Sequence, residues 1–341
     1  MGGRETLLKN IDTALVTGGG GFVGKAVVRL LLENNVKCRV IGRNRYPDIE
    51  SLGVDCRVGD IRDRQAVIRA SKGVDCVFHV AALAGIWGKW KTYYDINVVG
   101  TENVLEGCRK NGVPYLVYTS TPSVVFSKKN IAGEDESLPY ATRFLCHYAR
   151  SKVLAEKMVL MANNQLVKSC AIRPHLIWGP GDPHLVPRLI ESGRKRKLAI
   201  VGSGKNLVDI TFIENVAHAH VLAAENLSTS ATSGGKAYFI GQEKPVALWE
   251  WINTLFMELG IPPVEKKVSF TVARRLGAVY EMMYTLFRLQ GEPRMTRFLA
   301  YQLAHSHYFS HENAEKDLNY RPIVSLEEGM KMLVAWAKAL L

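Results

Sequence analysis

The chain has 341 residues, of which 47% are hydrophobic and 22% are charged. This composition excludes a disordered chain, a collagen-like chain and a disulfide-rich mini-protein. Forty-four Lys and Arg against 32 Asp and Glu give a net charge of +12, which suits nucleic acid, an anionic membrane surface, or a phosphorylated cofactor with an acidic substrate.

Short β-rich runs alternate with segments of helical periodicity in the first half of the chain. We predict strands at 13–18, 37–42, 55–60, 74–81, 115–121 and 168–174, and helices at 22–34, 63–72, 92–110 and 143–163. Strands that alternate with helices of this length form βαβ units, and near-continuous apolar strands are typical of parallel sheets covered on both faces. The sequence therefore predicts an α/β fold with a doubly wound parallel sheet.

The pattern changes after residue 180. A helix is predicted at 184–197, short strands near 198–201, 207–212 and 236–241, and a mostly helical stretch from 247 onward. We expect a first domain over residues 10–180, to which a segment of about 205–235 returns. A smaller, mostly helical lobe is expected over 181–341.

The cysteines and the N-terminus bear on the cellular compartment. The six cysteines stand 18 to 38 positions apart without a CxxC pair, which predicts free thiols in a reducing compartment. The first residues contain no apolar run typical of a secretory signal, so we expect a cytoplasmic protein. Gly2 and Thr6 match the myristoylation pattern, a match too short to be specific.

No segment is predicted to span a membrane. The most apolar stretch, 268–289, contains Arg274, Arg275, Glu281 and Arg288. These charges favour an amphipathic helix or the wall of an apolar pocket over a membrane span.

A glycine-rich turn, TGGGGFVG at residues 17–24, directly follows the first predicted strand and opens a helix. Gly18, Gly21 and Gly24 occupy the positions that a tight turn, a close approach to a pyrophosphate and close helix packing require. The helix N-terminus adds unpaired N–H groups and a positive dipole end for the phosphates. The first domain is therefore predicted to be a dinucleotide-binding Rossmann domain.

The end of the second strand indicates which dinucleotide is preferred. Sites for NAD place an acidic residue there, but this chain has Arg43 and Arg45 and no carboxylate before Asp48. Arg43, with Arg45 as a helper, can pair with a 2′-phosphate. We favour NADP(H), with NAD(H) and a plainly solvated basic turn as the alternatives.

Tyr148 is the only one of the 13 tyrosines that has a lysine four residues later, at Lys152. Residues at this spacing share one face of a helix, and an ammonium group lowers the pKa of a neighbouring phenol. Tyr148 is therefore a candidate proton donor or acceptor. Residues 118–123, YTSTPS, end a strand where parallel sheets bind ligands and supply hydroxyl groups that can hold a carbonyl.

With these motifs the chain resembles the extended short-chain dehydrogenase/reductases, and within them the 3β-hydroxysteroid dehydrogenase-like branch, over about residues 10–340. The stretches that carry the resemblance are TGGGGFVG (17–24), Asp60-Ile61, HVAA (79–82), DINVVGTENV (95–104), YTSTPSVVF (118–126), HYARSK (147–152), RPHLIWGPGD (173–182) and DITFIENVAHAH (209–220). AALAGIWGKW (81–90) points further, to the bacterial 2-alkyl-3-oxoalkanoate reductases of olefin biosynthesis.

The resemblance implies a catalytic set of Thr121, Tyr148 and Lys152, in which Tyr148 is the general acid and Lys152 lowers its pKa and holds the nicotinamide ribose. It also implies a cofactor site. That site comprises Gly18, Gly21, Phe22, Val23, Gly24, Arg43, Asp60, Ile61, Ala81, Ala82, Asn97, Thr119, Tyr148, Lys152, Pro174 and His175.

The second lobe is rich in large apolar residues, which suits a long-chain or polycyclic substrate. Trp87, Trp178 and Met283 are the candidate substrate contacts, although most residues of this kind belong to a core. The arginines at 173, 294 and 297 are candidates for a substrate carboxylate, with a surface role as the equal alternative. Trp178 stands where the wider superfamily has Tyr, which disfavours the sugar-nucleotide branch.

Together these features predict an NAD(P)H-dependent reductase of a 3-oxo group, with a 2-alkyl-3-oxoalkanoate as the favoured substrate. The alternatives are a 3β-hydroxysteroid or 4-carboxysterol 3-dehydrogenase, a nucleotide-sugar epimerase or dehydratase, and a dinucleotide-binding redox sensor. The histidines show no metal-ligand spacing, and the basic run 194–197 lacks the aromatic residues of a nucleic-acid site, so we expect neither partner. We expect a homodimer and a peripheral contact with a membrane or an acidic partner.

Overall fold

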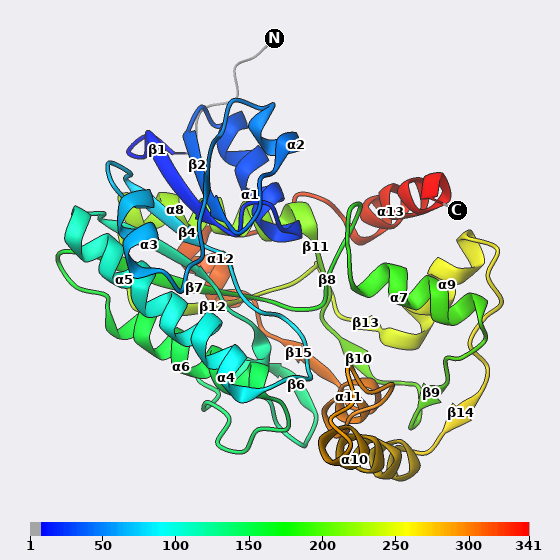
Figure 1. Cartoon of the computed structure of the whole chain (residues 1–341). Helices are drawn as coiled ribbons and strands as arrows, with labels where there is room; N and C mark the ends of the chain where they lie inside the picture. The colour runs from blue at the N-terminus through cyan, green and yellow to red at the C-terminus, as the bar shows by residue number, and fades with distance from the viewer. Residues whose placement is uncertain (1–7, 341) are drawn as a thin grey trace.

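A seven-stranded parallel sheet forms the centre of the protein in the computed structural model, which describes residues 8–340 (Figure 1). The strands lie in the order β12-β7-β5-β4-β1-β2-β3. They are β1 (Thr13–Thr17), β2 (Lys37–Gly42), β3 (Asp55–Val58), β4 (Cys76–His79), β5 (Tyr115–Thr119), β7 (Lys168–Pro174) and β12 (Ala237–Ile240). From β1 the chain adds β2 and β3 on one side, and then β4, β5, β7 and β12 on the other side. The change of side lies between β1 and β4, and α/β sheets bind ligands at such a switch point.

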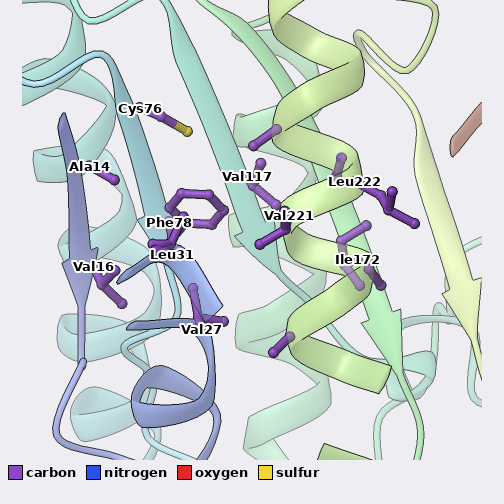
Figure 2. Packing of buried hydrophobic residues seen from close by; sticks show 14 of the residues in the cluster. Ala14, Val16, Val27, Leu31, Cys76, Phe78, Val117, Ile172, Val221 and Leu222 are labelled. Atoms are coloured by element: carbon purple, nitrogen blue, oxygen red, sulfur yellow. The ribbon is translucent and has the colours of Figure 1, made fainter. Parts of the chain in front are cut away.

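Helices cover both faces of this sheet because its central strands carry apolar side chains on both sides. Every residue of β4 is buried, as are all but the first residue of β1 and β7, whereas the edge strand β3 has none buried. One face packs against α1 (Phe22–Glu33), α8 (Ile213–Ser228) and α12 (Glu312–Leu318), and the other against α3 (Arg64–Ala70), α5 (Gly100–Asn111) and α6 (His147–Met161). Figure 2 shows the first face, where Val221 of α8 lies beside Val117 of β5 and Phe78 of β4 lies beside α1.

A second hydrophobic core lies outside the large sheet. It is built by α7 (Leu185–Arg194), α9 (Leu248–Glu258) and α13 (Leu326–Leu340) around Trp178, Phe212 and Trp251. The Trp178 ring meets Phe212 at 5.0 Å and Trp251 at 5.2 Å between centroids. A Cβ on Gly329 of α13 would lie 2.9 Å from the Trp178 ring, so the last helix packs closely on this cluster.

The remaining elements are short. A four-stranded sheet has the order β13-β10-β15-β6, and two strand pairs join β11 to β8 and β14 to β9. These strands are β6 (Ile131–Glu134), β8 (Ile177–Trp178), β9 (Ile200–Val201), β10 (Leu207–Val208), β11 (Thr211–Phe212), β13 (Val246–Ala247), β14 (Lys267–Val268) and β15 (His307–Phe309). The other helices are α2 (Pro47–Glu50), α4 (Trp90–Tyr93), α10 (Phe270–Leu286) and α11 (Arg297–Ala304), with a 3₁₀ turn at Pro122–Val125.

The predicted doubly wound α/β fold with a mostly helical C-terminal part is confirmed. The predicted helix over 92–110 is confirmed as part of a continuous helical stretch through α4 and α5, with a π-helical turn at Tyr94–Val99 between them. The strands β6 and β15 were not predicted, since their three- and four-residue sequences carry little periodicity. The division at residue 180 stays a prediction, and β12 and α12 of the later half pack with the large sheet.

The structure bears on the predictions about the cysteines, a membrane span and the N-terminus. The six cysteines are free thiols, and five of them are buried. Within residues 8–340, no helix has the length and apolar character needed to cross a bilayer. Gly2 and Thr6 lie outside the described residues.

Trp178 gives a direct test of the second core. Replacing Trp178 by Ala removes a fully buried side chain from contact with Phe212 and Trp251. We expect the free energy of unfolding to fall by about 3–5 kcal/mol in denaturant titrations, because the lost contacts leave a cavity. Leu166→Ala, which truncates a side chain that is 76% exposed, is the control and should change stability by less than about 0.5 kcal/mol. Equal effects of both substitutions would contradict a core role for Trp178.

Candidate active site

The glycine-rich turn after β1 is held in a tight conformation. Gly18 has a φ of +69°, and its N–H donates to the Ile41 carbonyl at 3.0 Å. A Cβ on Gly18 would lie 2.9 Å from the Cα of Ala81, and one on Gly24 would lie 2.2 Å from the Gly18 carbonyl oxygen. These two glycines are therefore required for the turn to approach β4 and for α1 to approach the turn.

Gly21 differs from the other two glycines because a Cβ there would meet one atom only and at a longer distance. A Cβ there would meet only the Gly18 carbonyl oxygen within 4 Å, at 3.3 Å. Gly21 is the N-cap of α1 and offers no side chain, so the N–H groups of the first turn point out of the helix without an intrahelical partner. This bare helix N-terminus fits a pyrophosphate group.

A cavity of about 610 Å³ extends from this turn across the carboxyl edge of the sheet. Cavities of this size hold small molecules and cofactors. Its lining includes nearly every residue predicted for the cofactor and for catalysis. These are Gly18, Gly21, Phe22, Val23, Gly24, Arg43, Asp60, Ile61, Ala81, Ala82, Thr119, Thr121, Tyr148, Lys152, Pro174 and His175.

Behind the cavity wall, a chain of hydrogen bonds joins β1, β4 and α5 through the buried His79. The Thr101 hydroxyl donates to the Asn97 carbonyl, so its oxygen accepts from His79 Nε2 at 2.9 Å. His79 Nδ1 then accepts from the Thr17 hydroxyl at 2.8 Å, and the Ala81 N–H donates to Thr17 Oγ1 at 3.1 Å. Burial lowers the pKa of His79 to about 3, so the ring is neutral. This set of hydrogen bonds fixes the cavity wall at Ala81.

Asn97 lies behind the cavity rather than in its lining, on the π-helical turn. Its side chain exchanges hydrogen bonds with the backbone of Leu83, accepting at 2.7 Å and donating at 3.1 Å. It also donates to Ser151 Oγ at 2.9 Å, and Ser151 donates to the Tyr148 carbonyl. Asn97 thus connects the cavity wall at Leu83 to the helix that carries Tyr148. Single π-helical turns within α-helices recur at functional sites.

Tyr148 and Thr121 meet at the carboxyl edge of β5. Burial raises the pKa of Tyr148 to about 12, while the Thr121 side chain, its hydrogen-bond partner, opposes that rise. This differs from the expectation that Lys152 lowers the pKa of Tyr148. In the structure the Lys152 ammonium donates to the Thr119 carbonyl, and the Tyr148 hydroxyl keeps its proton at neutral pH.

The Lys152 ammonium is buried beside the end of β5. It donates to the Thr119 carbonyl at 2.6 Å and lies 4.0 Å from the centre of the Tyr118 ring. Burial lowers the pKa of Lys152 to about 7, against the opposing charge of Glu156. Lys152 is therefore a group whose charge changes near neutral pH.

Glu156 is itself fixed by a buried ion pair. Arg173 donates to both of its carboxylate oxygens, at 2.6 and 3.0 Å, and Tyr140 donates at 2.7 Å. Arg173 is thereby committed to Glu156, which argues against its proposed role at a substrate carboxylate. Arg297 is likewise bonded to Glu281.

At the other end of the cavity, Arg43 follows β2 and faces the space beside the glycine-rich turn. Asp60 is bound by Arg62 through two side-chain hydrogen bonds at 3.0 and 2.6 Å, and this pairing lowers the pKa of Asp60. Tyr46 also lines this end, with its ring against Gly20 and Gly42. Tyr46 was not predicted, although its position three residues after Arg43 places it next to the expected site of the 2′-phosphate.

His175 connects the cavity to the C-terminal part of the chain. Its Nε2 lies 2.6 Å from His307 Nδ1, and His307 Nε2 donates to the Gln302 carbonyl at 2.8 Å. His307 Nδ1 is therefore the acceptor, and His175 donates to it. Burial lowers the pKa of both rings, so the pair is neutral. His307 and Gln302 were not predicted, because they lie more than 120 residues from His175.

The three predicted substrate residues lie apart from one another. Trp87 is half-buried and its ring meets Tyr284 at 6.1 Å, Trp178 is in the second core, and Met283 is exposed on α10. None of the three lines the cavity, and their substrate roles stay predictions. The cavity wall beyond Tyr148 is instead built by Ile86, Leu176, His184, Leu185, Phe298 and Gln302. Within residues 8–340, no three His, Cys, Asp or Glu side chains gather as a metal site.

Comparison with known proteins gives consistent matches. The sequence model of the 3-beta hydroxysteroid dehydrogenase/isomerase family matches residues 15–272. A 2-alkyl-3-oxoalkanoate reductase of Stenotrophomonas maltophilia is 47% identical and one of Shewanella oneidensis 46% identical, covering 95% and 97% of this chain and 99% and 88% of the relatives. A mouse sterol-4-alpha-carboxylate 3-dehydrogenase (decarboxylating) is 36% identical over 94% of this chain and 89% of its own. The crystal structure of gox2253 superposes with a TM-score of 0.79 at 27% identity, covering 96% of this chain and 98% of that one.

Two alanine substitutions in the turn should separate folding from binding. Gly24→Ala places a Cβ against backbone, which we expect to destabilise the protein by about 1–3 kcal/mol in thermal or denaturant unfolding. A Cβ at Gly21 would meet only the Gly18 carbonyl oxygen, so Gly21→Ala should destabilise the protein less than Gly24→Ala, while the dinucleotide Kd, measured by fluorescence titration, rises at least tenfold. A Gly21→Ala variant that binds the dinucleotide normally would contradict the placement of the pyrophosphate.

Proposed function

Because the chain belongs to the 3-beta hydroxysteroid dehydrogenase/isomerase family, whose relatives are named dehydrogenases and reductases, we propose that it reduces the 3-oxo group of a 2-alkyl-3-oxoalkanoate to the 3-hydroxy acid. The observation that carries this proposal is that Thr121, Tyr148 and Lys152 line one cavity with the glycine-rich turn. Two reductases of this name are 47% and 46% identical over nearly the whole chain, which supports the substrate.

The residues fit a nicotinamide dinucleotide, since a Cβ at Gly21 would enter the space beside the bare N-terminus of α1. When bound, the reduced cofactor supplies the hydride to the carbonyl carbon. Tyr148 supplies the proton: its hydroxyl, which burial keeps protonated, donates to the carbonyl oxygen as negative charge develops there. The Thr121 hydroxyl holds that oxygen, and the Lys152 ammonium, one helical turn from Tyr148, stabilises the phenolate that is left.

The outer part of the cavity supports a hydrophobic substrate. Beyond Tyr148 its wall contains Ile86, Leu176, Leu185 and Phe298, with His175, His184 and Gln302 among its polar groups. This mixture suits a long alkyl chain next to a small polar head. The sterol-4-alpha-carboxylate 3-dehydrogenase relative makes a carboxylated sterol the second candidate.

The compartment and the oligomeric state belong to the proposal as well. Six free thiols, five of them buried, support a reducing compartment such as the cytoplasm. We propose a homodimer, which light scattering of the purified protein tests.

The cofactor preference is proposed to be NADP(H). Arg43 lines the cavity next to Asp60, whose carboxylate is occupied by Arg62, so the guanidinium of Arg43 is available for a 2′-phosphate. No acidic residue ends β2 to bind a ribose 2′-hydroxyl, which disfavours NAD(H), the alternative.

Replacing Arg43 by Ala should raise the KM for NADPH by about 10–100-fold and leave the KM for NADH nearly unchanged, because one charge-assisted hydrogen bond is lost. Steady-state kinetics with both cofactors measures this. Arg45, two residues away, does not line the cavity, which does not support its predicted helper role, so Arg45→Ala is the matched control. A ratio of the two KM values that is the same in Arg43→Ala and in the unaltered protein would exclude the preference.

The reaction is tested with Tyr148→Phe, which removes only the proton-donating hydroxyl. We expect kcat for a long-chain 2-alkyl-3-oxoalkanoate to fall by about 10²–10⁴, while NADPH binding by calorimetry stays within threefold. Tyr115→Phe, at the opposite end of β5, is the control.

The same assay decides between the candidates. Substrates for comparison are a 4-carboxysterol, a 3β-hydroxysteroid and UDP-glucose, each with NADPH or NADP⁺ and with NADH or NAD⁺. Turnover of a sterol but not of the oxo acid would overturn the substrate assignment. Cofactor binding without turnover of any of them would favour a redox sensor, and binding of the UDP-sugar would favour the epimerase.

A further inference from the structure

Helix α10 presents an unusual amount of apolar side chain to solvent. Sixteen large hydrophobic residues are exposed among the described residues, and eight of them fall within the eighteen positions 272–289. These eight are Val272, Leu276, Val279, Met282, Met283, Leu286, Phe287 and Leu289. Scattered exposed apolar residues are normal on soluble proteins, but a contiguous set of this kind marks an interaction surface.

The two faces of α10 have opposite characters. Ala273, Gly277 and Glu281, four residues apart, are the buried positions of the helix. A Cβ on Gly277 would lie 2.6 Å from the backbone of Thr296, so this small-residue face packs closely at the start of α11. Val272, Leu276, Val279, Met283 and Leu286 follow each other at intervals of three or four residues, which places them on one stripe of the helix. The helix therefore packs through a narrow face that includes Ala273 and Gly277 and leaves most of its aliphatic side chains exposed.

Basic side chains surround this apolar stripe. Residues 262–297 contain seven Lys or Arg and three Glu. Two of the glutamates are already paired, Glu281 with Arg297 and Glu292 with Arg188. Six exposed basic residues of this stretch have no ion pair with any residue of the described range 8–340. These are Lys266, Lys267, Arg274, Arg275, Arg288 and Arg294.

The helix lies at the margin of the molecule, on the side where the cavity is walled by α11. In Figure 1, α10 forms the lower edge of the protein beside α11. Phe298 and Gln302 of α11 line the cavity, and Trp87, in the loop that also supplies Gly85 and Ile86 to the lining, contacts Tyr284 of α10. No described residue of α10 itself lines the cavity. The expectation of an amphipathic helix over 268–289 is confirmed, and its alternative of a pocket wall stays a prediction.

We propose that α10 is a docking helix for an anionic lipid bilayer. Its apolar stripe would enter the boundary between headgroups and acyl chains, and the arginines and lysines beside it would contact lipid phosphates. Helices with an apolar face and a basic polar face bind membranes in this in-plane manner, and anionic lipids strengthen the binding.

The charge of the surface decides between a bilayer and a second copy of the chain. A twofold interface brings the same patch of both subunits together, so the unpaired lysines and arginines around α10 would face their own copies. Like charges at an interface suppress association. A surface of anionic phosphates has the complementary charge and accepts the whole length of the stripe.

The docking has a consequence that rests on the proposed function. A bilayer seated on α10 would lie next to α11 and therefore next to the apolar end of the cavity. A long-chain oxo acid dissolved in that bilayer would then reach Tyr148 with its chain still partly in lipid.

The test is co-sedimentation of the purified full-length protein with vesicles that contain no substrate. Phosphatidylcholine vesicles with 30% phosphatidylglycerol are compared with pure phosphatidylcholine vesicles, at low and at high salt. We expect binding to the anionic vesicles that weakens at high salt. Leu286→Glu/Phe287→Glu, which alters two side chains that are 70% and 64% exposed, should lower the partition coefficient at least tenfold.

Matched variants separate the two parts of the surface. Leu166→Glu/Met257→Glu changes two equally exposed side chains elsewhere, 76% and 71%, and should bind like the unaltered protein. Arg274→Glu/Arg275→Glu should weaken binding at low salt by at least twentyfold, since each basic residue near an anionic surface contributes about fivefold. Circular dichroism checks that each variant is folded.

Three outcomes would overturn the proposal. They are no sedimentation of the unaltered protein with anionic vesicles, equal binding by the Leu286/Phe287 and Leu166/Met257 variants, and a dimer in light scattering that the Leu286/Phe287 variant alone converts to a monomer. Turnover of a short-chain, water-soluble 3-oxo substrate is measured in parallel. If the unaltered protein turns over this substrate but does not bind the vesicles, the docking helix alone is refuted. If it binds the vesicles but does not turn over the substrate, only the proposed function is refuted.

Discussion

The ammonium of Lys152 lies inside the protein, where it donates to the Thr119 carbonyl at 2.6 Å and faces the Tyr118 ring at 4.0 Å. A charge in this place loses its hydration, and burial lowers the pKa of Lys152 to about 7. Glu156, one turn further along α6, opposes that fall and is held in turn by Arg173 of β7. The buried charge therefore ties the ends of β5 and β7 to α6, and the remaining site residues are arranged around this junction.

Two neighbouring groups on α6 are shifted in opposite senses by the same burial. The pKa of Tyr148 rises to about 12 and that of Lys152 falls to about 7, so the phenol keeps its proton while the amine is poised near neutrality. Pairs whose pKa values are pushed apart are typical of acid–base sites. Because the folded-state pKa of Lys152 lies below its ordinary value, the folded protein binds fewer protons at this group above about pH 7, and its contribution to stability rises with pH from there to the ordinary lysine range.

The sequence predicts those parts of the site that lie within one strand–turn–helix unit. The glycine turn, Tyr148 and Lys152 have fixed local spacings, and the fold brings them to one cavity as expected. It does not predict contacts between distant segments, such as His175 with His307 or the wall at Phe298 and Gln302, because no local pattern encodes them. It also does not show which face of 268–289 is buried, since the fully buried face is made by the small residues Ala273 and Gly277 and by Glu281. The effect of burial on Tyr148 was likewise hidden, because it depends on what surrounds α6 in three dimensions.

Burial and Thr121, rather than Lys152, set the pKa of Tyr148 in the structure. We propose that the charge of Lys152 acts in the reaction itself, by stabilising the phenolate that is left when Tyr148 donates its proton. The decisive measurement is the pH dependence of kcat for NADPH-driven reduction of a 2-alkyl-3-oxoalkanoate between pH 5.5 and 9.5. We expect kcat to fall as the pH rises through about 7, where Lys152 loses its proton, and Lys152→Arg, which stays charged, to abolish this fall in the activity it retains. A kcat that is constant from pH 6 to 9 in the unaltered enzyme would contradict it.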